Sequence, residues 1–407
     1  MTSLDRRLGT TDAVFLGLGS MLGAGVFAAF TPAAQAAGSG LLVGLFVAAV
    51  VAFCNATSSA QLAAVYPTSG GSYVYGRERL GEWWGFIAGW SFVVGKTASC
   101  AAMALAFAAY AAPAGWERPL AAGAVLVLGA VNYRGIAKTA ALTRVIVVVV
   151  LLVLALALAT AAPAVTFDHA LVSSGPYGIL QSAGLLFFAF AGYARIATLG
   201  EEVREPARTI PRAIVISLGI VVLVYAAVAV VLLGSLGPEG IAADVAPLAA
   251  GAVGGLGWAA PVIRAGAAIA ALGALLGLMA GIGRTSLAMA RERDLPGWLA
   301  AVHPEYRSPH RAEAALTAVV VVLVLTLDVR GAIGFSSFGV LLYYFVANVA
   351  ALGQPAGERR YPRAFAVVGA LLCVLLVVTL PALSIVGGVL VIALGVAYRL
   401  IRLRLAP

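Results

Sequence analysis

Long apolar segments and short polar segments alternate along the whole chain. A run of about 20 apolar residues is long enough to cross a lipid bilayer as a helix. We predict twelve such spans and, because no polar segment forms a soluble domain, a single transmembrane domain over residues 1–407. The predicted spans are 11–37, 40–65, 83–112, 118–133, 141–162, 177–202, 210–235, 262–290, 312–328, 331–352, 363–380 and 382–401.

The composition agrees with an all-α polytopic membrane protein. Hydrophobic residues make up 62% of the chain and charged residues only 11%, against about 25% charged residues in a soluble domain. The three cysteines, Cys54, Cys100 and Cys373, lie inside predicted spans and have no CxxC spacing. This pattern indicates small packing residues rather than disulfide partners or metal ligands.

The basic residues predict the orientation of the chain, because cytoplasmic loops carry an excess of Lys and Arg. With the N-terminus inside, 21 of the 26 basic residues fall at inside loops or inside helix ends, and only Arg118, Arg264 and Arg330 fall outside. We therefore predict a multi-pass protein of the cytoplasmic membrane with both termini in the cytoplasm. The net charge of +9 is spread over many short loops, which argues against a nucleic-acid partner.

The first predicted span contains the sequence GSMLGAGVF at residues 19–27. Each glycine in a helix interior costs about 1 kcal/mol relative to alanine, so three glycines within seven residues predict an interrupted helix. Broken backbone at bilayer depth persists only where it is buried in protein or lines a watery cavity. The segment therefore indicates a binding site made of backbone groups. The alternative is that the glycines only permit close helix packing.

A second interruption is predicted at Gly192, inside the span 177–202. Gly23 and Gly192 each lie in the first span of a five-span unit, residues 11–162 and 177–352. Matching interruptions in two halves indicate the binding site of an inverted-repeat transporter. Five is an odd number of spans, so the halves insert with opposite orientation. The last two spans, residues 363–401, lie outside the repeat and are available for a homodimer contact.

Several motifs resemble those of the amino acid–polyamine–organocation (APC) permeases. They are residues 19–27, the sequence PTSGGSY at 67–73, the sequence FFAFAG at 187–192, and the sequence EEVREPARTIP at 201–211. The resemblance covers essentially the whole chain. It implies a leucine-transporter-type fold of five plus five inverted spans with two additional C-terminal helices. It also implies alternating access, an amino acid or amine substrate, and no cofactor.

The two breaks suit the common end of an amino acid. Free N–H groups at a helix N-terminus favour a carboxylate, and free carbonyls favour an ammonium group. We place the substrate carboxylate on Ser20, Gly23, Ala24 and Gly25. The ammonium group is placed on carbonyls near Ser20 and Met21 and on those of Phe188, Ala189, Phe190 and Ala191. Phe190 and Tyr193, on either side of Gly192, are expected to line or gate the side-chain pocket.

Lys96 lies about 13 residues into its predicted span, which is roughly mid-membrane at about 1.5 Å per residue. An ionisable residue at that depth is a functional hypothesis by default, so Lys96 is our candidate for coupling transport to protons. The alternative is a structural lysine paired with a carboxylate or with carbonyls. Some proton-coupled relatives carry a lysine in the fifth helix, but here the matching residues 147–152 are all apolar.

Arg195 follows the second break, and Glu201 and Glu202 lie beyond it. Arg195 could contact an acidic substrate side chain, pair with Glu201 or Glu202, or form part of a gate. Glu202 is seven residues, or two helical turns, beyond Arg195, so a direct ion pair between them is not favoured. The two glutamates are candidates for an intracellular gate or a loop anchor, with a solvated charge run as the alternative.

The leading functional hypothesis is a secondary-active amino acid permease that works by proton coupling or exchange. A polyamine or amine permease of the same fold is the alternative, followed by a channel or a membrane-embedded enzyme. An enzyme is not predicted, because no nucleophile–base pair or metal-ligand spacing lies at membrane depth. A Walker-type glycine-rich loop is absent from the sequence, which argues against ATP as the energy source.

Overall fold

A computed structural model describes residues 8–68, 70–135, 140–166, 174–200, 202–253 and 257–405. Within these ranges the chain is helical, with one isolated bridge between Leu8 and Val203. Each predicted span coincides with one helix or with an interrupted series of helices. The helices are α1 (Thr10–Met21), α2 (Ala24–Ala28), α3 (Phe30–Ala37), α4 (Leu41–Val65), α5 (Ser72–Leu80), α6 (Glu82–Ala111), α7 (Glu117–Tyr133), α8 (Ala140–Ala161), α9 (Pro176–Phe190), α10 (Ala194–Ala197), α11 (Pro206–Ala243), α12 (Pro247–Ala250), α13 (Ala259–Arg291), α14 (His310–Thr326), α15 (Val329–Leu352), α16 (Arg363–Thr379) and α17 (Ala382–Leu405).

The lengths and hydropathy of these helices confirm a polytopic membrane protein. Nine helical segments in the described part of the chain are long and apolar enough to cross a bilayer. Helices α7, α14 and α16 have 17 residues each, which is shorter than these segments. The number of helices that cross the bilayer and the inverted five-plus-five repeat therefore stay predictions.

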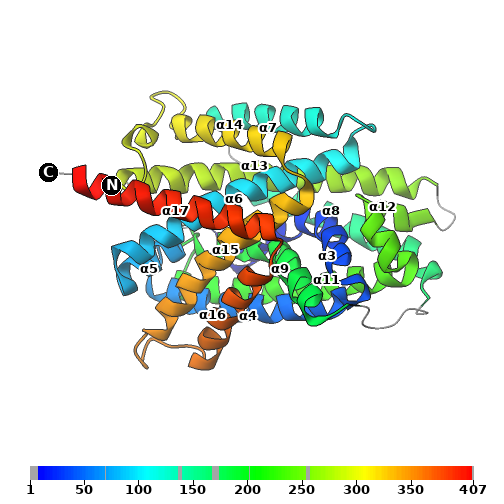
Figure 1. Ribbon diagram of the computed structural model, residues 1–407, viewed down its shortest axis with the longest axis horizontal. Coiled ribbons are helices and arrows are strands. Elements are labelled where there is room, and N and C mark those ends of the chain that lie inside the picture. Colours follow the sequence, from blue (N-terminus) through cyan, green and yellow to red (C-terminus); the bar gives the residue numbers. More distant parts are fainter. Residues whose placement is uncertain are drawn as a thin grey trace.

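The interior is built around α6 and α15, which pack closely against each other. Glycines permit this approach, since a Cβ atom on Gly95 would lie 3.1 Å from the Cα atom of Gly339. In Figure 1, α6 and α13 run through the middle of the molecule, and α7 and α14 lie side by side along one edge. Small residues at helix crossings let backbones come together in membrane proteins, where hydrophobicity alone does not drive association.

A buried carboxylate joins three parts of the chain at one end of the bundle. Asp294 follows α13 and accepts a hydrogen bond from the Tyr73 hydroxyl of α5 at 2.8 Å. It also forms a buried ion pair with Arg399 of α17. The Arg399 guanidinium lies 4.9 Å from the ring centres of Trp83 and Phe86 on α6. Asp294 therefore connects α5 and the end of α13 with the C-terminal helix α17.

Tyr73 acts as a donor in this cluster. Burial, and then the hydrogen bond to the Asp294 carboxylate, raise the pKa of the Tyr73 hydroxyl well above its ordinary value. The hydroxyl thus keeps its proton over the whole physiological pH range.

The substitution Asp294→Asn should destabilise the protein by about 3 kcal/mol, because it removes the buried carboxylate partner of Arg399 and leaves only Glu82, an exposed carboxylate 3.4 Å away. The measurement is the thermal unfolding midpoint of the purified protein in detergent. Glu205→Gln is the matched control, since the Glu205–Arg208 pair is about three-quarters exposed and such pairs contribute about 0–1 kcal/mol. Equal midpoints for the two variants would contradict the proposed anchoring role.

Candidate substrate site

The first predicted break is present in the structure. Helix α1 ends at Met21, and α2 begins at Ala24. Gly23 between them has φ −67° and ψ −122°, which is outside the helical region. The N–H groups of residues 23–25 therefore stand at the start of a new helical segment, where N–H groups have no partner within the helix.

The second predicted break is also present, but it takes a milder form. Helix α9 ends at Phe190, a 3-10 turn covers Ala191–Tyr193, and the short helix α10 follows at Ala194–Ala197. Tighter turns of this kind inside a helical run often mark functional hinges. Gly192 lies in the middle of the turn, as its position between aromatic residues led us to expect.

The two breaks touch each other through backbone atoms. A Cβ atom on Gly192 would lie 2.5 Å from the carbonyl carbon and oxygen of Ser20, and one on Gly25 would lie 2.7 Å from the Cα atom of Ala189. The structure thus brings the predicted residues of the two helices into one place. Ser20 and Gly192 are half-buried, whereas the other predicted site residues are buried. The full set is Ser20, Met21, Gly23, Ala24, Gly25, Phe188, Ala189, Phe190, Ala191, Gly192 and Tyr193.

Tyr225 of α11 is a site residue that the sequence analysis missed. Its hydroxyl lies 2.6 Å from the carbonyl oxygen of Met21 and 3.1 Å from that of Ala189. A hydroxyl carries one proton, so the two carbonyls share a single donor that bridges the breaks. A tyrosine alone in a long apolar span was the signal, since a buried tyrosine hydroxyl usually finds a partner.

Lys96 of α6 reaches the second break. Its ammonium group donates a hydrogen bond to the carbonyl oxygen of Ala191 at 3.1 Å, and the residue is only 6% exposed. The Tyr344 hydroxyl approaches the same carbonyl at 3.4 Å. Within the described ranges, Lys96 forms no ion pair with a carboxylate. Its ammonium group thus sits on one of the carbonyls that we predicted for the ammonium group of a substrate.

Of the charged residues after the second break, Arg195 and Glu202 lie within the described part of the chain. Arg195 is half-buried on α10 and forms no salt bridge with Glu202 within the part of the chain that the structure describes. Glu202 contributes its backbone instead, because its carbonyl accepts a hydrogen bond from the Leu8 N–H at 3.1 Å, and the Arg204 N–H donates to the Leu8 carbonyl at 2.9 Å. Glu201 lies outside the described residues.

Glu313 is a second residue that the sequence analysis overlooked. It belongs to the first turn of α14, is 2% exposed, and lies against Gly283 of α13. Its Oε2 atom has no hydrogen-bond partner among the described residues. Glu313 falls inside the predicted span 312–328, and a carboxyl group within a span should have been noted as an intramembrane ionisable group. Elsewhere in the described residues, no group of three His, Cys, Asp or Glu side chains is placed to hold a metal ion.

The structure is that of a polytopic helical membrane protein in which two interrupted helices touch through their backbones. Interrupted helices of this kind are found in secondary transporters. The chain belongs to the amino acid permease family, whose family model matches residues 8–403. The predicted resemblance to the APC permeases is confirmed by this match. The class of the protein is thus a membrane transporter.

Three relatives illustrate the range of the similarity. An uncharacterized transporter of Mycobacterium tuberculosis is 59% identical over 399 residues, which cover 97% of this chain and 90% of the relative. A branched-chain amino acid permease of Bacillus subtilis is 26% identical over 89% of this chain and 84% of its own length. A methylthioribose transporter of Bacillus subtilis is 28% identical over 84% of this chain and 77% of its own length.

Gly192→Ala should destabilise the protein by about 1–3 kcal/mol, because overpacking forces the neighbouring backbone to move. The added carbon would lie 2.5 Å from two atoms of Ser20, whereas carbon atoms in contact are about 3.5–4.0 Å apart. The thermal unfolding midpoint measures the effect. Gly219→Ala on α11 is the control, since a Cβ atom added at Gly219 would meet no atom within 4 Å. Similar midpoints for both variants would refute the close contact between the breaks.

Proposed function

We propose that this protein is a secondary-active amino acid permease of the cytoplasmic membrane, with both termini in the cytoplasm, that works by alternating access. The observation that carries the proposal is the contact between the two helix breaks, with the carbonyl groups of Met21, Ala189 and Ala191 gathered around them. The family and the name of the branched-chain amino acid permease agree with this substrate class.

The proposed site holds the two charged groups that all free amino acids share. The N–H groups of residues 23–25 face the substrate carboxylate at the start of α2, and the carbonyls of the second break accept hydrogen bonds from its ammonium group. Backbone groups recognise only this common end, so the substrate side chain is selected by the residues around it. Among these we place Phe190 and Tyr193, which are both fully buried.

Lys96 is the proposed coupling residue. In the structure its ammonium group donates a hydrogen bond to the Ala191 carbonyl. A substrate ammonium group that binds the same carbonyl would have to displace it. When Lys96 gives up its proton, its amine becomes neutral and can leave this carbonyl to the substrate. Binding of a substrate ammonium group is thereby linked to release of a proton from Lys96. A lysine that stayed charged would instead favour substrate exchange without proton movement.

The substrate class is tested by thermal stabilisation of the purified protein, since a ligand that binds the folded state raises its stability by mass action. A panel of amino acids, polyamines and methylthioribose is measured at two pH values. An amino acid present at about 100 times its Kd should contribute about 2.7 kcal/mol. Stabilisation by methylthioribose or polyamines alone would overturn the amino acid assignment.

The coupling role is tested by uptake of the stabilising amino acid into proteoliposomes with and without an imposed proton gradient. Lys96→Met should abolish the effect of the gradient while substrate binding persists, because no proton is then released on binding. Lys96→Arg is the matched variant, since an arginine keeps its positive charge at all relevant pH values. It should weaken binding and should also remove the gradient effect. Full gradient-driven uptake by Lys96→Met would dismiss the coupling role.

A further inference from the structure

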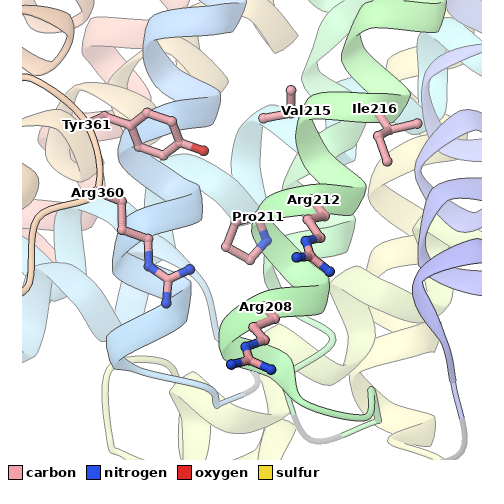
Figure 2. A pocket seen from close by; sticks show the side chains of 7 residues that line it. All are labelled: Arg208, Pro211, Arg212, Val215, Ile216, Arg360 and Tyr361. Carbon is pink, nitrogen blue, oxygen red and sulfur yellow. The ribbon is translucent and has the colours of Figure 1, made fainter.

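A basic pocket of about 410 Å³ lies apart from the proposed substrate site. It is formed where the first turns of α11 approach the segment that joins α15 to α16, as Figure 2 shows. The pocket is lined by Arg208, Pro211, Arg212, Val215, Ile216, Arg360 and Tyr361. Pro211 lies between Arg360 on one wall and Arg212 on the other (Figure 2).

Three arginine side chains line this pocket (Figure 2), and within the described part of the chain they share one carboxylate partner. Arg208 and Arg212 are four residues apart on α11 and therefore lie on the same face of the helix. Arg208 has one carboxylate partner, Glu205 at 3.5 Å, and both side chains are about three-quarters exposed. Within the described part of the chain, Arg212 and Arg360 form no ion pair. The backbone N–H of Arg360 donates to the Gln61 side chain at 3.3 Å, which fixes the loop against α4.

The pocket continues directly into an apolar surface. Val215 and Ile216 are 40% and 47% exposed, and both follow Arg212 by about one turn. Ile216, Leu223 and Val230 are spaced by seven residues and are all exposed, so they form one outward-facing row along α11. Exposed apolar side chains on a membrane-spanning helix face lipid acyl chains. A ligand that fills the whole surface has an anionic group at the arginines and an apolar tail along this row.

We propose that this pocket binds an anionic phospholipid, with its phosphate group on Arg208, Arg212 and Arg360 and an acyl chain along α11. The planar arginine side chain forms paired hydrogen bonds with phosphate oxygens. Basic pockets between helices at the membrane surface suit the headgroups of anionic lipids. A free phosphate ion would use the arginines but would leave the apolar row without a role. The site therefore assigns a lipid ligand to a surface that amino acid transport does not require.

The test compares lipid binding by native mass spectrometry of the purified full-length protein. The probe is phosphatidylglycerol, with phosphatidylcholine of the same acyl chains as the neutral lipid. The double variant Arg212→Gln/Arg360→Gln should bind phosphatidylglycerol roughly tenfold more weakly, with unchanged binding of phosphatidylcholine. Arg402→Gln/Arg404→Gln removes two charges from the end of α17 and is the matched control, which should bind as the wild type does.

Two further measurements on the wild-type protein keep the proposal open to refutation even if the double variant folds poorly. A photoreactive phosphatidylglycerol should label peptides that contain residues 206–216 or 355–363. Phosphatidylglycerol should raise the thermal unfolding midpoint, and inorganic phosphate should not. The proposal is overturned by equal phosphatidylglycerol binding of the double variant and the control, by labelling elsewhere only, or by equal stabilisation from inorganic phosphate, which would indicate a free-anion site.

Discussion

Direct backbone contact between the two helix breaks is the constraint on which the rest of the site depends. Gly25 and Gly192 have no side chain, which allows the backbone of α2 to approach Ala189 of α9 and the backbone of the turn after α9 to approach Ser20 of α1. Where they meet, the carbonyl groups of Met21, Ala189 and Ala191 are gathered and accept hydrogen bonds from side chains. An unpaired polar group in such surroundings costs several kcal/mol, so other elements must supply donors.

Two side chains from distant parts of the chain supply those donors. Tyr225 covers the carbonyls of Met21 and Ala189, and Lys96 covers that of Ala191. Each contact provides a hydrogen-bond donor for a backbone carbonyl. The contact is reversible, because a tyrosine hydroxyl or a lysine amine can move aside for another donor. The same groups that stabilise the ligand-free protein thus hold positions that an ammonium group could take.

The long apolar runs were enough to predict the helices, and the glycine clusters were enough to predict both interruptions. The partners of Lys96 and Tyr225 could not be predicted, since they lie on other helices and their positions depend on how the helices cross. The role of Arg195 stays a prediction, and the backbone contacts of Glu202 and Arg204 with Leu8 could not be predicted because they join segments far apart in the sequence. Glu313 was visible in the sequence as a carboxylate within a span and was simply overlooked. The number of crossings remains a prediction, since three of the helices have only 17 residues, and the inverted repeat remains a prediction as well.

The short bridge between Leu8 and Val203 has a mechanical consequence. Two backbone hydrogen bonds tie the segment that precedes α1 to the segment that follows α10. Leu8 is only two residues before α1, and Val203 is six residues after α10. These hydrogen bonds join the N-terminal end of the first interrupted helix to the segment that follows the second one. A motion that separates these two ends has to break both hydrogen bonds. A motion that keeps the bonds intact moves the two ends together.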